Sequence, residues 1–220
     1  MRQGVSIFAV GDPAGAAFGS AGERCMALPV VVPVGDDTAD ALRETPNPAI
    51  AAPTAALSSD PDAHYGPVVN EAHKQRVENY IQMCADEGGE LVVDGRGFTL
   101  QGHEKGFFVG PTLFDHVTTD MAIYREEIFG PVLVIARAAD YEEALAMASE
   151  HEYGNGVAVF TRDGDTARDF VARVGVGMVG VNVPIPVPIA YYTFGGWKRS
   201  GFGDLNQHGA DAFRFYTKTK

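Results

Sequence analysis

The pattern of apolar and polar positions predicts one long helix near the middle of the chain. Between residues 70 and 87, four apolar side chains recur at spacings of three and four: Val77, Tyr80, Ile81 and Cys84. Such a stripe is typical of an amphipathic helix that packs on a core. Cys84 lies on this stripe, so we expect a packed core thiol. Gly88 and Gly89 follow at once and predict the end of the helix.

The second half of the chain alternates apolar strands with amphipathic helices. Strands are predicted at 131–137, 157–160 and 178–183, and helices over 141–148 and 167–174 lie between them. Short connections between such elements are typical of parallel strands joined by right-handed crossovers. The pattern therefore indicates an α/β fold whose mostly parallel sheet has flanking helices.

The first half is less regular. A small apolar stretch over 14–21 predicts a helix, and the continuous apolar run 28–34 predicts a strand buried on both faces. A helical pattern over 36–42 leads into three closely spaced prolines, which break helices. We therefore expect 44–63 to be an irregular surface segment. Further extended segments are predicted at 91–93, 107–109 and 111–117.

Composition narrows the classes of function. The 220 residues carry 17 basic and 29 acidic side chains, for a net charge of −12. An acidic chain repels phosphate backbones, so we expect no nucleic-acid partner. No long hydrophobic run predicts a signal peptide or a membrane helix. The two cysteines form no CxxC pair, which favours free thiols and a cytoplasmic location. The six histidines lack paired spacing, so we predict no metal site.

One dinucleotide-like motif has the wrong context. Gly175, Gly177 and Gly180 give the spelling GxGxxG. The phosphate-binding motif follows a strand and opens a helix, so that the helix N-terminus meets the phosphates. Here the glycines follow a predicted helix and enter a predicted strand. We interpret them as a helix end and a tight turn.

Cys25 has the setting of a possible nucleophile. It follows Arg24 in a glycine-containing segment, Gly19–Leu28, just before the apolar run. Nearby cations lower the pKa of a thiol and so increase the thiolate that attacks. The alternative interpretation is a small buried residue at a helix-to-strand junction, because cysteine is among the most buried residue types.

Four segments in order carry a family resemblance. They are GSAGERCMAL at 19–28, YREEIFGPVL at 124–133, YGNGVAVFT at 153–161 and FGGWKRSGFG at 194–203. Together they resemble the C-terminal part of the aldehyde dehydrogenase superfamily. Arg24 directly before Cys25, together with the segment 180–188, resembles the CoA-acylating branch, that of methylmalonate-semialdehyde dehydrogenase. The resemblance covers a catalytic domain over 14–220, and residues 1–13 form a divergent N-terminal segment.

The resemblance implies a covalent mechanism on Cys25. Its thiolate would attack the carbon of a small semialdehyde, hydride would pass to NAD, and coenzyme A would take the acyl group from the resulting thioester. Methylmalonate or malonate semialdehyde would then give propionyl-CoA or acetyl-CoA with loss of carbon dioxide. Arg24 matches the position that binds the substrate carboxylate. The alternative for Arg24 is a surface side chain that only packs its stem.

Three further residues match cofactor or supporting positions of the family. Glu127 matches the glutamate that binds the nicotinamide ribose hydroxyls, and Phe129 matches the aromatic residue beside the nicotinamide ring. Asn182 matches an asparagine that supports the loop of the catalytic cysteine. From the residues alone, Glu127 is a solvated carboxylate, Phe129 a core side chain and Asn182 a residue of a strand-end turn.

The resemblance also predicts missing parts. The NAD-binding domain of the family is largely absent from these residues, and the chain stops at Lys220, short of the family's oligomerisation tail. We therefore expect a partial chain. The alternative function is a non-catalytic remnant that at most contacts other subunits, since the family is usually homo-oligomeric. A third, weaker alternative is an esterase-like activity of Cys25 without NAD.

Overall fold

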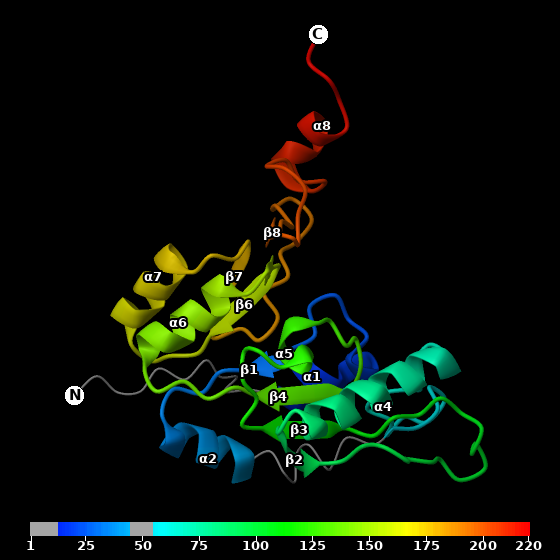
Figure 1. The fold of residues 1–220 in the computed structure, drawn as a ribbon. Helices are drawn as coiled ribbons and strands as arrows, with labels where there is room; N and C mark the ends of the chain where they lie inside the picture. The colour runs from blue at the N-terminus through cyan, green and yellow to red at the C-terminus, as the bar shows by residue number, and fades with distance from the viewer. Residues whose placement is uncertain (1–12, 45–54) are drawn as a thin grey trace.

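The computed structural model describes residues 13–44 and 55–220, so nearly all of the divergent segment 1–13 lies outside the described residues. The chain contains both helices and strands, and they alternate most regularly from β4 to β7 (Figure 1). The helices are α1 (Pro13–Phe18), α2 (Asp36–Glu44), α4 (Glu71–Asp86), α5 (Ala122–Arg125), α6 (Tyr141–Glu150), α7 (Gly164–Arg173) and α8 (Ala212–Phe215), with 3-10 turns η1 (Gly19–Gly22) and η2 (Gly209–Asp211). The strands are β1 (Val30–Val31), β2 (Glu90–Val93), β3 (Thr112–Asp115), β4 (Val132–Ile135), β5 (Tyr153–Gly154), β6 (Gly156–Val159), β7 (Met178–Val181) and β8 (Trp197–Lys198).

A four-stranded mixed sheet forms the lower part of the molecule in Figure 1. Its strand order is β1-β4-β3-β2, with β4 parallel to both neighbours and β2 antiparallel to β3. All residues of β3 and β4 are buried. This burial on both faces explains why β4 appears in the sequence as a continuous apolar run, whereas β3 also buries the polar Thr112 and Asp115.

A second layer holds the strand–helix–strand pattern of the second half. Strand β6 pairs with β7 in parallel, with α6 and α7 beside them (Figure 1). The parallel pairing confirms the expectation for these two strands. Strand β4 does not join them, because β1 and β3 already occupy both of its edges. A short antiparallel pair, β5 and β8, joins the third and fourth family segments.

Strand β1 is shorter than the apolar run that predicted it. The run contains Pro29 and Pro33, which have no N–H to donate to a neighbouring strand. Both prolines instead accept through their carbonyl oxygens, from the N–H groups of Val134 at 2.9 Å and Ala138 at 3.0 Å. The run therefore stays extended beside β4 while its regular strand shrinks to two residues.

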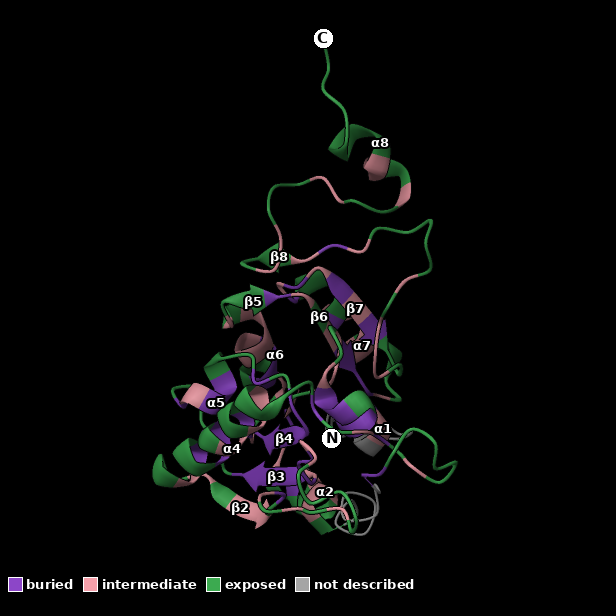
Figure 2. Ribbon diagram, turned by 90° about the vertical axis from the view of Figure 1, so that its right-hand side faces the viewer, coloured by how far each residue is buried: buried purple, intermediate pink, exposed green. Residues whose placement is uncertain are grey.

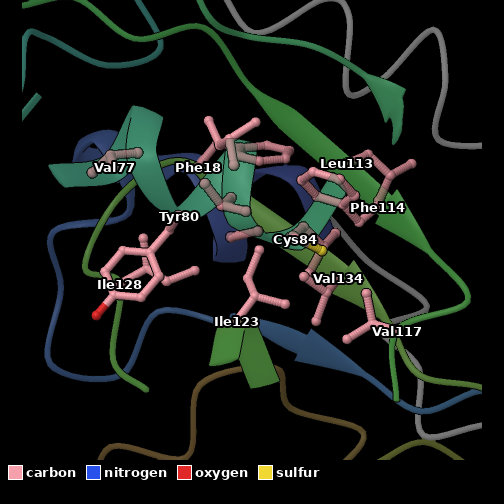
Figure 3. Packing of buried hydrophobic residues seen from close by; sticks show 14 of the residues in the cluster. Phe18, Val77, Tyr80, Cys84, Leu113, Phe114, Val117, Ile123, Ile128 and Val134 are labelled. Carbon is pink, nitrogen blue, oxygen red and sulfur yellow. The ribbon is translucent and has the colours of Figure 1, made fainter. Parts of the chain in front are cut away.

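Helix α4 follows the predicted pattern. Its four buried residues are the predicted apolar stripe, and Cys84 is fully buried. The side chain of Asn70 caps the first turn by accepting from the N–H of His73 at 2.9 Å. Gly88, at φ +102°, ends the helix in a left-handed conformation. Figure 3 shows the stripe packed against side chains of β3, α1 and α5, which form the main core.

The predicted irregular surface segment 44–63 is exposed over 57–62, but the prediction is wrong for the two described residues before them. Residues 45–54 lie outside the described residues, but Ala55 and Ala56 are buried rather than on the surface. Ala55 forms a bridge with Tyr65, and the N–H of Ala56 donates to the Tyr65 carbonyl at 3.0 Å. Small side chains allow this strip of backbone to lie against the core.

Burial falls toward the end of the chain. Figure 2 shows buried strands in the body and an exposed segment that leads through α8 to the C-terminus. No helix among the described residues is long and apolar enough to cross a membrane.

Candidate active site

A cavity of about 650 Å³ brings together residues of all four family segments. Arg24 and Cys25 line it from the loop after η1, and Glu127 and Phe129 line it from the loop between α5 and β4. The β5–β6 connection and the segment before and after β8 complete the wall. Asn182 is the one predicted site residue that is not among the lining residues.

The loop that carries Cys25 has an unusual backbone. Ser20 and Ala21 both adopt φ 56°, a left-handed conformation that non-glycine residues rarely take. Gly22 follows at φ +70°, and a Cβ there would lie 2.0 Å from the carbonyl oxygen of Gly130. Only glycine fits this contact. The close approach brings the cysteine loop against the loop that carries Phe129.

The two cysteines differ sharply in environment. Cys25 is exposed at the cavity, whereas Cys84 is buried in the core. Burial, with a smaller contribution from the charge of Glu87, raises the pKa of the Cys84 thiol to about 12. Cys84 is therefore a structural thiol, and Cys25 alone is open to a reactant.

The guanidinium of Arg24 folds back over η1. Its Nε donates to Oγ of Ser20 at 3.2 Å, and a Cβ on Gly19 would lie 2.6 Å from its Nη2. The neighbouring acid, Glu23, turns away to the start of α4, where it accepts from the N–H of Val69 at 3.1 Å. Arg24 thus presents a positive charge at the cavity, held by a neutral hydroxyl.

The loop between α5 and β4 is anchored by helix α4. Nη2 of Arg76 donates to the backbone carbonyl oxygen of Glu127 at 3.0 Å. This contact does not involve the side-chain carboxylate of Glu127, which is exposed. Phe129 has φ 59° and its side chain is 38% exposed, so it is not the core residue of the alternative interpretation. Tyr80 donates to the carboxylate of the adjacent Glu126.

His73 links the two loops, a contact that the sequence analysis missed. Its Nε2 lies 2.6 Å from the carbonyl oxygen of Phe129 and 3.3 Å from the carboxylate of Glu23. A carbonyl oxygen only accepts, so Nε2 carries the hydrogen. The only local signal was the capping residue Asn70, which fixes the helix start and hence the place of His73.

Asn182 lies at the ends of β6 and β7. Its Oδ1 accepts from the N–H of Thr161 at 3.0 Å, and its Nδ2 donates to the Thr161 carbonyl at 3.1 Å. Its backbone is left-handed, at φ 57°. This geometry matches the strand-end turn of the alternative interpretation. A supporting role for the cysteine loop stays a prediction.

The third and fourth segments meet beside the cavity. The N–H of Gly154 donates to Oγ of Ser200 at 3.1 Å. Nζ of Lys198 donates to the carbonyls of Ser149 and His151, at 2.7 and 2.8 Å, where α6 ends. Burial lowers the pKa of Lys198, yet the two carbonyls and the end of the helix favour its ammonium form. These contacts fix the wall that carries Asn155.

Comparison with known proteins identifies the family. The model of the aldehyde dehydrogenase family matches residues 9–220. The chain belongs to the aldehyde dehydrogenase family. The α/β fold predicted from the sequence is therefore the fold of this family, with a mixed sheet and flanking helices.

Several similar proteins of the family are named as semialdehyde dehydrogenases. The malonate-semialdehyde dehydrogenase of Pseudomonas aeruginosa is 54% identical over 206 residues, which are 94% of this chain and 41% of that protein. A protein from Sinorhizobium meliloti 1021, assigned as a methylmalonate-semialdehyde dehydrogenase, was solved with NAD and is 56% identical to this chain, with a TM-score of 0.92. The match covers 95% of this chain and 43% of the Sinorhizobium chain. The methylmalonate-semialdehyde dehydrogenase of Oceanimonas doudoroffii is 52% identical with a TM-score of 0.91, over 94% of this chain and 42% of its own. The chain thus spans about two fifths of the length of these relatives.

Proposed function

We propose that the chain is the nucleophile-bearing part of a CoA-acylating dehydrogenase that oxidises malonate or methylmalonate semialdehyde with NAD. The observation that carries the proposal is the convergence of Cys25, Arg24, Glu127 and Phe129 on one cavity. The names of the relatives and the NAD complex of one of them support the substrate class and the cofactor. The natural assembly as a homo-oligomer is part of the proposal.

The chemistry assigned to this chain rests on Cys25. Its thiolate adds to the aldehyde carbon, and the carbonyl oxygen becomes an oxyanion within reach of the backbone N–H of Cys25. Loss of hydride leaves an acyl thioester on the sulfur. The bond between the α-carbon and the substrate carboxylate would break, carbon dioxide would leave, and the α-carbon would take up a proton from water. The thiol of coenzyme A would displace Cys25 from the thioester, and the Cys25 sulfur would leave as the thiolate. Exposure of the sulfur at the cavity suits both thiol steps.

The remaining residues bind rather than react. A planar guanidinium such as that of Arg24 pairs with a carboxylate through two hydrogen bonds, which suits a semialdehyde acid in an otherwise acidic chain. The exposed Glu127 carboxylate would accept from the ribose hydroxyls of NAD, and the exposed Phe129 ring would lie beside the nicotinamide. When bound, NAD supplies the acceptor for hydride.

The direct test is NADH formation by the 220-residue chain with NAD, coenzyme A and malonate semialdehyde. We expect NADH from the native chain and from Cys84→Ala, which removes the buried thiol, and none from Cys25→Ser. No NADH above the Cys25→Ser control at high protein concentration would falsify the dehydrogenase activity of this chain and favour the non-catalytic remnant. Hydrolysis of an activated ester by Cys25 without NADH would favour the esterase alternative.

A second substrate separates the roles of Arg24 and Cys25. Propanal lacks the carboxylate that Arg24 is proposed to bind. We expect Arg24→Met to lower kcat/KM for malonate semialdehyde by about ten- to a hundredfold, the range for hydrogen bonds to a charged group, and to leave propanal nearly unchanged. An equal loss for both substrates would assign Arg24 to the structure of the loop instead.

A further inference from the structure

The side-chain amide of Asn155 holds the backbone of the loop that carries Cys25. Its Nδ2 lies 3.2 Å from the carbonyl oxygen of Cys25 and 3.1 Å from Sδ of Met26. A carbonyl oxygen only accepts, so the amide must turn its NH2 end toward the loop. One side chain thus meets two consecutive residues of the loop, across 130 positions of sequence.

Asn155 is itself fixed on both sides. Its backbone carbonyl oxygen accepts from the N–H of Met178 in β7 at 3.1 Å. The preceding residue, Gly154, donates to Ser200 and accepts from the N–H of Gly177 at 3.0 Å. The amide of Asn155 therefore projects from a backbone that both the β6–β7 sheet and the fourth family segment hold in place.

The side chain of Met26 also packs closely on Gly156. A Cβ on Gly156 would lie 2.3 Å from Cε of Met26. The glycine lets the Met26 side chain pack directly on the start of β6, next to the hydrogen bonds from Asn155. Packing and hydrogen bonding thus act on the same turn, which runs from Arg24 to Ala27. In this turn the N–H of Ala27 donates to the Arg24 carbonyl at 3.1 Å.

We propose that Asn155 is a positioning residue for the Cys25 nucleophile. Its hydrogen bond fixes the plane of the Cys25–Met26 peptide, and a fixed peptide plane restricts the ψ angle of Cys25 and the direction in which its thiol points. The catalytic consequence rests on the proposed function. The hold on the loop does not, because it is a property of the folded chain.

Hydrogen exchange of the loop amides tests the hold without any substrate. The N–H groups of Ala27 and Leu28 donate to the carbonyls of Arg24 and Ala16, both at 3.1 Å, so they report on the turn. We expect Asn155→Leu and Asn155→Asp, both close in shape to asparagine, to speed exchange of these two amides about tenfold, while α4 keeps its native exchange rates.

Two controls separate the hydrogen bond to Cys25 from other effects. Met26→Leu removes the sulfur acceptor and keeps the volume, and we expect less than a twofold change in exchange. Asn79→Leu makes the same substitution on the exposed face of α4 and should leave the loop unchanged. Native exchange in both Asn155 variants, with circular dichroism that confirms folding, would overturn the proposal. So would an effect of Met26→Leu as large as that of Asn155→Leu.

Steady-state kinetics then tests the consequence for catalysis. Because Asn155 acts through the loop and not on the cofactor, both variants should lower kcat and leave KM for NAD unchanged. Unchanged kcat with faster exchange would overturn the positioning role in catalysis. If the native chain forms no NADH, the proposed function fails, and the exchange result still decides whether Asn155 holds the loop.

Discussion

Left-handed backbone conformations recur on the segments that build the site. Of the six non-glycine residues with positive φ in the described parts of the chain, four lie in the family segments, namely Ser20, Ala21, Phe129 and Lys198, and Phe129 lines the cavity. Each such residue costs free energy and persists only where its surroundings hold it, which is typical of functional sites. At Phe129 the surroundings are visible, since His73 binds its carbonyl oxygen. The Phe129 side chain lines the cavity and is exposed, whereas the pattern of apolar positions alone predicts a core residue.

Solvent access at the two thiols leads to a prediction at the same scale. An exposed Cys25 and a Cys84 whose pKa is raised to about 12 should react with iodoacetamide at very different rates. We expect Cys25 to be modified at least a hundredfold faster at neutral pH, and Cys84 to react only after unfolding. Mass spectrometry of the peptides that contain each cysteine measures both rates. Equal rates in the folded chain would contradict the activated setting of Cys25.

At the scale of elements, the spacing of apolar residues predicts those features that depend only on which side chains face the core. Helix α4 was predicted with its buried face, because one apolar stripe faces one core. The short length of β1 and the separation of β4 from β6 were not predicted, because they depend on which strand edges are free and on which carbonyls the prolines offer. The same limit applies to the site. The motifs predicted Cys25 and Glu127, but the hydrogen bonds of His73 and Asn155 cross between elements distant in sequence.

Helix α2 is joined to the sheet by a shared arginine. Arg137 donates to the buried Asp115 of β3 through Nε at 3.0 Å and Nη2 at 2.7 Å. It also reaches Asp36 at 3.2 Å and Asp40 at 2.8 Å in α2. Burial acts to raise the pKa of Asp115, but the hydrogen bonds from Arg137 and from the N–H of His116 outweigh it, and the pKa is lowered.

Asp115→Asn should therefore destabilise the fold in a pH-dependent way. Breaking a buried pair on one side costs about 3–5 kcal/mol of unfolding free energy at neutral pH. Because the folded pKa lies below the unfolded value of about 3.9, the contribution is present above that pH and is lost as pH falls through the folded pKa. Urea unfolding at several pH values should show the gap between native and variant narrowing below about pH 4.

A surface pair provides the matched control for this substitution. Asp165 pairs with Arg168 on α7, with side chains that are 88% and 75% exposed. Asp165→Asn should change the unfolding free energy by less than about 1 kcal/mol, since water screens exposed pairs. If both variants lose the same stability, or if the gap for Asp115→Asn stays constant with pH, the buried pair does not act as described.

The whole molecule divides into a packed body and an exposed end. Two hydrophobic clusters, one around α4 with β3 and β4 and one around α6 and α7, contain most of the buried apolar side chains of the described residues. No residue from 201 to 220 is buried, and large aromatic side chains there, such as Phe202, Phe213 and Tyr216, are more than two thirds exposed. Exposed apolar surface of this kind favours association with another protein surface.

Two truncations test this division. A chain that ends at Asp211 loses no buried side chain, so its unfolding free energy should stay within about 1 kcal/mol of the native value. A chain that ends at Gly196 also loses β8, the Lys198 contacts with the end of α6 and the Ser200 bond to Gly154. We expect this shorter chain to be less stable in urea, by about 2 kcal/mol from the lost hydrogen bonds.

The two truncations also differ in what they do to the nucleophile loop. Ser200 binds the residue next to Asn155, so the chain that ends at Gly196 should exchange the Ala27 amide faster, whereas the chain that ends at Asp211 should match the native rate. If the chain that ends at Asp211 is destabilised by more than about 2 kcal/mol, the exposed end packs on the body. A native exchange rate in the shorter truncation would show that β8 and Ser200 do not support the Cys25 loop.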